Sequence, residues 1–314
     1  MTADGCLGRA ASTAATFLFF LLQCLSAAGD GNSHSAGRID VTDSLGRRVT
    51  IPAPASRIVC ISPGACESLF AIGAGAAVVA VASSCDYPAA ATLVPNVAGP
   101  DSGSVEEEKV IALHPDLVVT SGLDDRGIDA RFLARGLRVF AYSPTDFVGI
   151  ARSIMALGAL TGEARASIIL AASITEGVRR LRTITDAIPT DRKPRILWLS
   201  SSDPLRTCGR GSLPQAIMDA AGGRNAFIGL AGEGARVSAE DLAERAPQMI
   251  VAPTRRGESF DLAALASSQG SASIPAIRDG KVFTIPEDLV SRGGPRIVLG
   301  LLVVAKYLHP DLFP

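Results

Sequence analysis

Three side chains in predicted turns of this 314-residue sequence could bind a large polar molecule. Tyr87 offers a flat face and a hydroxyl, which suit the edge of a macrocycle. Arg206 and Arg292 could bind amide, carboxylate or phosphate groups through their planar guanidinium donors. The alternative is that such residues are common in turns without any ligand, and that Tyr87 packs beneath its own turn.

Residues for catalysis do not accompany these side chains. The sequence has no Gly-x-Ser-x-Gly, no His-Glu-x-x-His, no phosphate-binding Gly-x-x-x-x-Gly-Lys-[Ser/Thr] and no convincing dinucleotide fingerprint. Ser62 and Asp86 could share a site, but none of the three histidines, His34, His114 and His309, is placed to serve them. We therefore predict that the chain is not an enzyme, and keep a secreted enzyme on a similar two-lobed scaffold as a remote alternative.

Short apolar runs rich in β-branched residues alternate with helical patterns, which predicts parallel strands with helical crossovers. The expected strands are Arg57–Ser62, Val78–Ser83, Leu117–Ser121 and Val139–Ser143, followed later by Arg195–Ser200, Met249–Pro253 and Val282–Ile285. Ligands collect at the carboxyl ends of such strands. We therefore expect a cleft lined by residues that follow strands, namely Ser62, Pro63, Cys66, Asp86, Tyr87, Pro88, Asp203, Leu205, Arg206, Thr207, Ser291, Arg292 and Gly293.

A helical stretch separates the two sets of strands. Asp146 can cap a helix over Phe147–Leu160, and Glu163 to Ile188 is expected to form one long helix that Pro189 ends. We predict an α/β fold of two similar lobes with mainly parallel sheets flanked by helices, joined by one long backbone helix. The expected boundaries are 39–145 for the N-terminal lobe, 146–190 for the connector and 191–314 for the C-terminal lobe. A stiff single connector predicts modest closure on a ligand.

The two halves share a short pattern. Glu108 stands seven residues before Pro115 (115 − 108), and Glu240 stands seven residues before Pro247 (247 − 240). Each proline precedes an expected strand. The match is short, so coincidence is the alternative, but with the restart of the strand–helix alternation it favours two similar lobes over one large sheet.

The first residues have the features of an export signal. Arg9 is followed by the apolar run Thr16–Leu25 and by the small residues Ser26, Ala27 and Ala28, which predicts a cleaved signal peptide at 1–28. An uncleaved anchor is the alternative. Residues 29–38 are expected to form a flexible leader, and the mature protein is expected in the periplasm. A net charge of −1 gives no electrostatic case for nucleic acid.

Four cysteines remain after the signal: Cys60, Cys66, Cys85 and Cys208. An oxidising compartment would permit one disulfide among them, but the pairing does not follow from the sequence. Buried free thiols are the alternative. A zinc site is less favoured, because no Cys-x-x-Cys or histidine pair accompanies them.

Several segments, taken in order, resemble the periplasmic binding proteins of ABC importers that carry vitamin B12, haem and iron–siderophores. The segments are Arg57–Gly75, Cys85–Pro88, Lys109–Val119 and Gly294–Arg296, and the resemblance covers Asp40 to Pro314. It implies the helical-backbone fold of metal-chelate binding proteins. Cys85–Pro88, Pro204–Gly209 and Ala221–Phe227 look most like the vitamin B12 binders. Ala98-Gly99-Pro100, without an aromatic residue, departs from them.

The resemblance also implies a role, a ligand and partners. The ligand would be cobalamin or another corrinoid, bound as cargo by a monomer without a cofactor. Haem, with Tyr87 as iron ligand, and a ferric siderophore are the alternatives. One glutamate on each lobe, Glu108 and Glu240, would dock into arginine pockets of a permease dimer that carries ATPase subunits. The ordinary alternative is that both glutamates only favour helix N-termini.

Overall fold

The computed structural model describes residues 38–99, 104–122, 127–255, 258 and 273–313. Residues 39–314 form one compact unit. The expected signal peptide and all of the expected leader except Arg38 lie outside the described residues. In the part of the chain that is described, no helix has the length and apolarity needed to cross a membrane.

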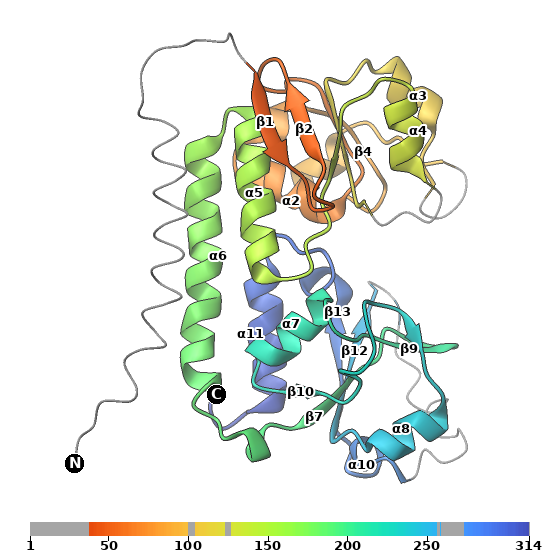
Figure 1. The fold of residues 1–314 in the computed structure, drawn as a ribbon, viewed down its shortest axis with the longest axis vertical. Coiled ribbons are helices and arrows are strands. Elements are labelled where there is room, and N and C mark those ends of the chain that lie inside the picture. Colours follow the sequence, from red (N-terminus) through yellow and green to blue (C-terminus); the bar gives the residue numbers. More distant parts are fainter. Residues whose placement is uncertain (1–37, 100–103, 123–126, 256–257, 259–272, 314) are drawn as a thin grey trace, which may run out of the picture. The chain divides into compact units, whose positions relative to one another are not determined.

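The N-terminal half holds a four-stranded parallel sheet in the order β4-β3-β5-β6 (Figure 1). Its strands are β3 (Ile58–Cys60), β4 (Val78–Val81), β5 (Leu117–Thr120) and β6 (Val139–Ala141). An antiparallel hairpin, β1 (Ile39–Thr42) with β2 (Arg48–Ile51), precedes them. The helices of this half are α2 (Pro63–Ala71), α3 (Glu107–Ala112) and α4 (Ile128–Ala134), with 3₁₀ turns η1 (Ala74–Ala77) and η2 (Ala89–Leu93).

Both faces of this sheet are covered, which explains why its strands read as continuous apolar runs. Ile58 and Cys60 face a core shared with α2, while Val59 faces a second cluster with Val110 and Phe132. The sequence predicted these four strands, and the structure confirms them.

Two antiparallel helices follow, α5 (Phe147–Thr161) and α6 (Ala164–Thr185). The Asp146 carboxylate caps α5 by accepting the Gly149 N–H at 2.6 Å, as predicted. Gly162, at a φ of 80°, reverses the chain. The long helix α6 is confirmed, and it ends at Thr185, three residues before the expected Ile188 (188 − 185).

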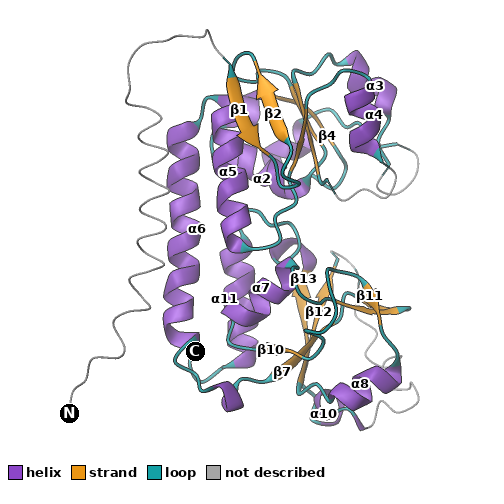
Figure 2. Cartoon of the chain, viewed as in Figure 1, coloured by secondary structure: helices purple, strands orange, loops and turns teal. Residues whose placement is uncertain are grey.

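The C-terminal half holds a second four-stranded parallel sheet in the order β10-β7-β12-β13. Its strands are β7 (Arg195–Trp198), β10 (Arg224–Asn225), β12 (Met249–Thr254) and β13 (Val282–Pro286). Around it lie α7 (Leu213–Ala220), α8 (Ala239–Arg245), α10 (Pro275–Arg278) and α11 (Ile297–Leu308), with turns η3 (Thr190–Arg192) and η5 (Glu287–Leu289). Two parallel sheets flanked by helices confirm the α/β fold (Figure 2).

A small antiparallel sheet in this half was not predicted. It pairs β8 (Ser201–Ser202), β9 (Leu205–Thr207) and β11 (Ala235–Arg236) in the order β11-β9-β8. The segment after β7, expected as a loop, is therefore a hairpin. These strands have only two or three residues each, which is too short for an apolar alternation to appear in the sequence.

One hydrophobic cluster joins the two sheets. It runs from Leu117 in the first sheet through Leu157 of α5 and Ile174 of α6 to Ile196 in the second sheet and Leu301 of α11. A side chain at Gly158 would place its Cβ 2.0 Å from the Ser167 Oγ, so glycine permits the close approach of α5 and α6. The connector is therefore part of the core rather than a loose linker.

Candidate functional site

Two adjoining cavities lie at the carboxyl ends of the strands. The first, of about 490 Å³, is lined by the C-terminal half, by Trp198–Asp203, Pro253–Arg255, Glu287, Val290 and Ser291 among others. The second, of about 440 Å³, is lined by Asp86 and Tyr87 of the N-terminal half and by residues of the C-terminal half. The two cavities share Thr254, Arg255, Glu258 and Glu287. Together they form a cleft of the kind predicted for a bulky ligand.

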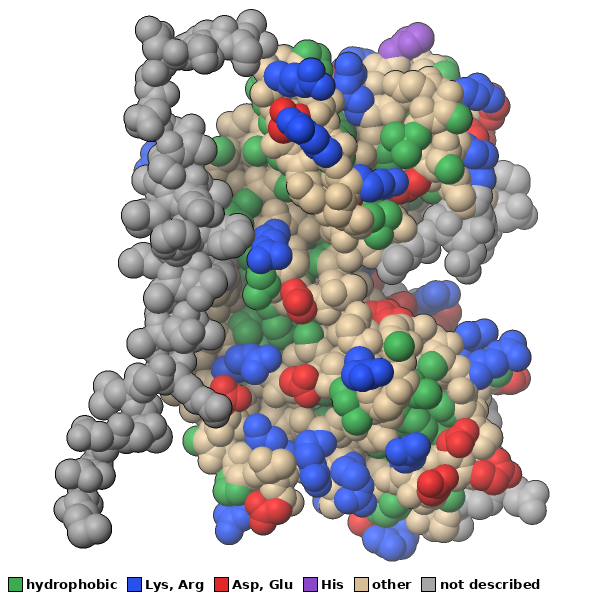
Figure 3. Space-filling view, viewed as in Figure 1, with side chains coloured by type: hydrophobic (Ala, Val, Ile, Leu, Met, Phe, Trp, Pro, Cys, Tyr) green, Lys and Arg blue, Asp and Glu red, His purple; other side chains and the backbone are tan. Residues whose placement is uncertain are grey.

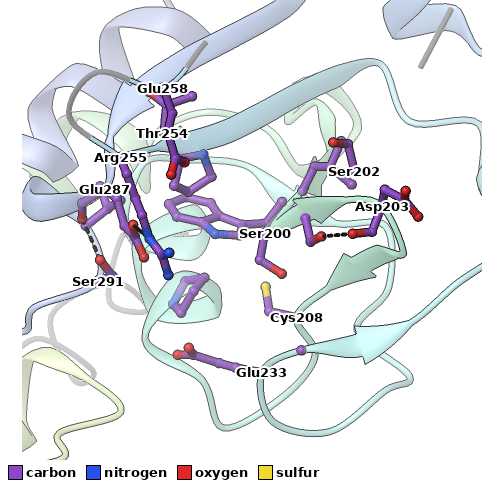
Figure 4. A pocket seen from close by; sticks show the side chains of 17 residues that line it. Ser200, Ser202, Asp203, Cys208, Glu233, Thr254, Arg255, Glu258, Glu287 and Ser291 are labelled. Carbon is purple, nitrogen blue, oxygen red and sulfur yellow. Dashed lines mark hydrogen bonds and ion pairs between the residues drawn. The ribbon is translucent and has the colours of Figure 1, made fainter. Parts of the chain in front are cut away.

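The walls of the 490 Å³ cavity combine apolar and acidic groups. Trp198, Leu199, Pro253 and Val290 supply apolar surface. Asp203, Glu233, Glu258 and Glu287 supply carboxyl groups, and Arg255 is the one basic residue among its described lining residues. Figure 4 shows Glu233 and Cys208 across the cavity from Arg255 and Glu287.

Two of these acids have identifiable electrostatic surroundings. The Arg255 Nε lies 3.0 Å from the Glu287 Oε2, which partly neutralises both. Neighbouring protein atoms exclude water from the Glu233 carboxyl and raise its pKa, although its side chain keeps contact with solvent. The cavity therefore presents more acceptors than donors, and it suits a ligand that brings N–H or O–H groups.

A cluster of ion pairs that we name the Glu67 clasp adjoins the second cavity, and its members are Glu67, Asp86, Asp288, Arg292 and Arg296. Asp86, Asp288 and Arg296 also line the cavity. The Glu67 side chain of α2 is 1% exposed, and Arg296 binds it in a bidentate manner, with Nε–Oε2 at 3.0 Å and Nη2–Oε1 at 2.5 Å. Arg292 Nη1 lies 3.2 Å from the same Oε1 and 2.7 Å from the Asp86 Oδ1. Arg292 also pairs with Asp288. The clasp thus joins α2 and the turn after β4 to the segment before α11.

The clasp shifts the pKa values of Asp86, Arg292 and Arg296. Burial alone would raise the pKa of Asp86, but the hydrogen bond and charge of Arg292 outweigh it, so the Asp86 pKa lies below its ordinary value. Hydrogen bonding to Glu67 raises the pKa of Arg296. Asp86, Arg292 and Arg296 are therefore charged at neutral pH.

Close backbone packing accompanies the clasp. A Cβ at Gly64 would lie 1.7 Å from the Arg292 carbonyl oxygen, so a glycine is required where α2 meets this segment. The Tyr142 hydroxyl, on the segment after β6, donates to the Gly293 carbonyl at 2.9 Å. The two halves therefore meet at a second junction besides the connector helices.

Tyr87 stands at the wall of the 440 Å³ cavity. Its side chain is 45% exposed, and the Arg296 guanidinium carbon lies 3.9 Å from its ring centroid. One ring face is thus held by a cation–π contact. This arrangement leaves Tyr87 accessible to a ligand rather than packed beneath its turn.

The residues predicted to line the cleft separate into two groups. Asp86, Tyr87, Asp203 and Ser291 do line the cavities. The structure gives the others contacts within the protein: Ser62, Pro63 and Cys66 begin α2, Pro88 begins η2, Leu205 packs in the second core, Arg206 donates to the Gly234 carbonyl, Thr207 donates to the Trp198 carbonyl, Arg292 belongs to the clasp and Gly293 accepts from Tyr142.

Sequence reasoning missed several residues that line the cavities. Thr254 and Arg255 end and follow β12, and Glu287 follows β13, so the rule that ligand residues follow strands would have found them. Glu67 lies within a helix and carried no such signal.

The two glutamates predicted to dock a permease are exposed. Glu108 lies in the first turn of α3, and Glu240 lies in the first turn of α8. A hydrogen bond from its own backbone N–H, together with Ser238, lowers the pKa of Glu240. Both carboxylates are available at the surface, while docking itself stays a prediction. On the face drawn in Figure 3, acidic and basic side chains are interspersed.

The four described cysteines are free and buried. Among the described residues, no group of three or more His, Cys, Asp and Glu side chains is arranged to hold a metal ion. His309 Nε2 lies 3.1 Å from the Gly222 carbonyl oxygen, and burial lowers its pKa. Neither His309 nor Gly222 is among the residues that line the two cavities.

Comparison with known proteins gives several relatives of similar length. A vitamin B12-binding protein of Yersinia pestis is 28% identical over 80% of this chain and 86% of its own. An uncharacterized ABC transporter substrate-binding lipoprotein of Bacillus subtilis, YvrC, is 25% identical over 88% of this chain and 87% of its own. A cobalamin-binding protein of Halobacterium salinarum is 26% identical over 85% of this chain and 73% of its own.

Solved structures share the fold. The periplasmic vitamin B12 binding protein BtuF of Vibrio cholerae superposes with a TM-score of 0.70 at 24% identity, over 82% of this chain and 98% of its own. The periplasmic heme-binding protein BhuT superposes with a TM-score of 0.69 at 23% identity over the same shares. The model of the periplasmic binding protein family matches residues 58–289, which include both parallel sheets and most of the residues that line the cavities. This chain therefore belongs to the periplasmic binding protein family.

Proposed function

We propose that this chain is the substrate-binding component of an ABC importer and that it binds cobalamin or a related corrinoid in the cleft. The observation that carries the proposal is the pair of adjoining cavities, one of which both halves line. Relatives that are 26% and 28% identical and named as cobalamin- or vitamin B12-binding support the choice of ligand.

The chemistry of the cleft suits a corrinoid. A corrinoid carries amide side chains around its ring, and their N–H groups can donate to the carboxylates of Asp203, Glu258 and Glu287. The exposed face of Tyr87 can contact the flat ring, and its cation–π partner Arg296 holds the tyrosine in place before the ligand arrives.

The same acids disfavour haem, the first alternative. The carboxylates of haem would meet Asp203, Glu233, Glu258 and Glu287, which repel negative charge. Arg255 is already paired with Glu287, and Arg292 and Arg296 are held by the clasp. Tyr87 remains available as an iron ligand, so haem and an anionic ferric siderophore stay the ligands to test against.

Delivery to the permease follows from the exposed acids. Glu108 and Glu240 would each accept a bidentate pair from an arginine of the permease dimer, whose ATPase subunits drive release. Two anchors far apart in the sequence, one on a helix of each half, would fix orientation as well as affinity. The chain would act as a periplasmic monomer after removal of residues 1–28, and it would catalyse no reaction.

Calorimetric titration of the purified protein tests the ligand. We expect submicromolar binding of cyanocobalamin and at least tenfold weaker binding of haemin and of a ferric hydroxamate. A matched variant, Glu258→Arg, should weaken cyanocobalamin binding and strengthen haemin binding, because it inverts one charge at the shared part of the two cavities. Tight binding of haemin with no detectable binding of cyanocobalamin would reject the corrinoid proposal.

A further inference from the structure

Three thiols meet beneath the clasp, and the proposed transport function does not use them. We name Cys60, Cys66 and Cys85 the thiol cluster. Cys60 ends β3, Cys66 lies in the first turn of α2 and Cys85 follows β4. Their exposed fractions are 0%, 0% and 2%, and each thiol is an electrostatic neighbour of the other two.

Polar neighbours distinguish the three thiols. The Cys60 Sγ donates to the Ser62 carbonyl at 3.4 Å, and the Cys85 Sγ donates to the Cys60 carbonyl at 3.5 Å. The neighbouring thiols Cys60 and Cys85, together with the charge of Arg292, lower the pKa of Cys66 to about 4. Full burial raises the pKa of Cys60. Cys66 is therefore the thiol with the greatest thiolate character, and thiolate is the reactive form.

Two members of the thiol cluster, Cys66 and Cys85, each precede an acid of the Glu67 clasp. Cys66 immediately precedes Glu67, and Cys85 immediately precedes Asp86. Both of these acids bind the same nitrogen, Nη1 of Arg292. Cys66 and Cys85 are thus each one residue away from an acid that binds Arg292, whereas the Cys60 Sγ donates to the Ser62 carbonyl.

We propose that the thiol cluster is a redox modification site, at which Cys66 and Cys85 form a disulfide while Cys60 remains a thiol beside it. The oxidant is a small or protein disulfide, the class of reagent that oxidises thiols in export compartments. The bond would tie α2, which carries Glu67, to the turn that carries Asp86 and Tyr87.

The disulfide forms in two thiol–disulfide exchange steps. The Cys66 thiolate attacks one sulfur of the oxidant disulfide and displaces its other half as a thiolate, which takes up the proton that Cys66 gave up. Cys85, as it loses its proton, attacks the Cys66 sulfur of this mixed disulfide and displaces the second half as a thiol. The protein loses two hydrogen atoms, and the oxidant disulfide becomes two thiols.

Burial sets the conditions of the reaction. Because the thiols are enclosed in the folded protein, oxidation of the folded chain requires local opening, and oxidation during folding does not. Cys208, in the C-terminal half, is also buried, but its electrostatic neighbours are Ser212 and Glu233 rather than another thiol. It is the internal control.

Peptide mapping of the full chain tests the proposal. The protein is unfolded and refolded with oxidised glutathione, and its free thiols are alkylated. Trypsin releases one peptide, residues 58–109, because no Lys or Arg stands between Arg57 and Lys109. Cleavage after Glu67 separates Cys60 and Cys66 from Cys85. We expect the two pieces to be joined through Cys66, lighter by two hydrogen atoms, with Cys60 and Cys208 alkylated.

Serine variants identify which two cysteines form the disulfide. Cys60→Ser and Cys208→Ser should keep the cross-linked peptide, and Cys66→Ser and Cys85→Ser should lose it. Circular dichroism and thermal melting establish that each variant folds. Alkylation of all three cluster thiols in refolded wild-type protein would overturn the proposal, and so would a disulfide confined to the piece 58–67, which would join Cys60 to Cys66.

Discussion

The two parallel sheets have the same strand count, but their carboxyl edges differ. At the first sheet, β3 ends at Cys60 and α2 begins at Pro63, so the helix closes directly over the strand end and encloses the thiol cluster. At the second sheet, β7 ends at Trp198 and α7 begins only at Leu213. The intervening β8–β9 hairpin holds the edge open over a cavity of about 490 Å³.

This difference gives the carboxyl edges of the two sheets different roles, because the edge of the first is covered by a helix and the edge of the second lines the cleft. A helix that starts at the strand end fills the position where ligands bind in α/β proteins, so the first sheet contributes only the Asp86–Tyr87 turn to the cleft. The hairpin of the second sheet keeps that position free. The length of the first strand–helix connection therefore decides which half carries most of the cavity wall.

The largest expected effect comes from changing a feature that the two halves share. Each half has an exposed glutamate in the first turn of a helix. Glu108→Arg with Glu240→Arg should abolish corrinoid uptake by cells, because two carboxylates that accept arginine pairs become cations. Calorimetric affinity for cyanocobalamin should not change, since both residues lie outside the cavities. The control is the double variant Glu106→Arg with Glu244→Arg. Glu106 immediately precedes α3, and Glu244 lies in α8. Normal uptake by the Glu108/Glu240 double variant would remove the docking assignment.

The second effect concerns the closed edge of the first sheet. Glu67→Ala leaves Arg292 and Arg296 short of a buried partner, and we expect a loss of about 3 kcal/mol in the free energy of unfolding, measured with urea. Glu176→Ala is a matched control, because Glu176 also binds two arginines, Arg179 and Arg180, but on an exposed face of α6. Its cost should be much smaller, because water screens an exposed ion pair. Equal costs for the two variants would show that the clasp adds no stability.

The third effect concerns the one aromatic residue that the first half brings to the cleft. Tyr87→Ala should weaken cyanocobalamin binding by about thirtyfold, since a central aromatic contact contributes about 2 kcal/mol. Leu93→Ala, an apolar side chain that is 85% exposed and outside both cavities, should leave the affinity unchanged. An unchanged affinity for Tyr87→Ala would place the ligand wholly against the second half.

The smallest effect is a pH dependence of the clasp. The Asp86 pKa is lower in the folded chain than its ordinary value of 3.8, so its contribution to stability is present above that value. The contribution is lost as the pH falls through the lower, folded-state pKa. Wild-type protein should therefore lose more stability on acidification than Asp86→Asn, as thermal melting at a series of pH values would show. Parallel losses would mean that Arg292 does not stabilise the charged carboxylate.

Local patterns made much of the fold predictable. The buried strands read as β-branched runs because both faces of each sheet are covered, and α5 and α6 read as helices because their apolar residues recur at helical spacing. The β8–β9–β11 sheet could not be predicted, since its short strands are held by the cavity wall rather than by an apolar face.

The candidate site was predictable only in part. Tyr87 and Asp86 follow a strand and were found, as were Asp203 and Ser291. Arg292 follows a strand as well, yet it binds Glu67 and Asp86 within the protein. The choice between a ligand and an internal partner depends on which charges lie within a few ångströms, and sequence spacing does not give that.

The sequence by itself determined the alternation of strands and helices, the long connector helix and the placement of Glu108 and Glu240 at helix starts. These features depend on residues close together along the chain. Tertiary structure alone decided that Arg292 meets Glu67 across 225 positions and that three cysteines from separate elements become neighbours. Such encounters arise from packing of distant segments, where distance and burial, rather than residue order, set the electrostatic energy.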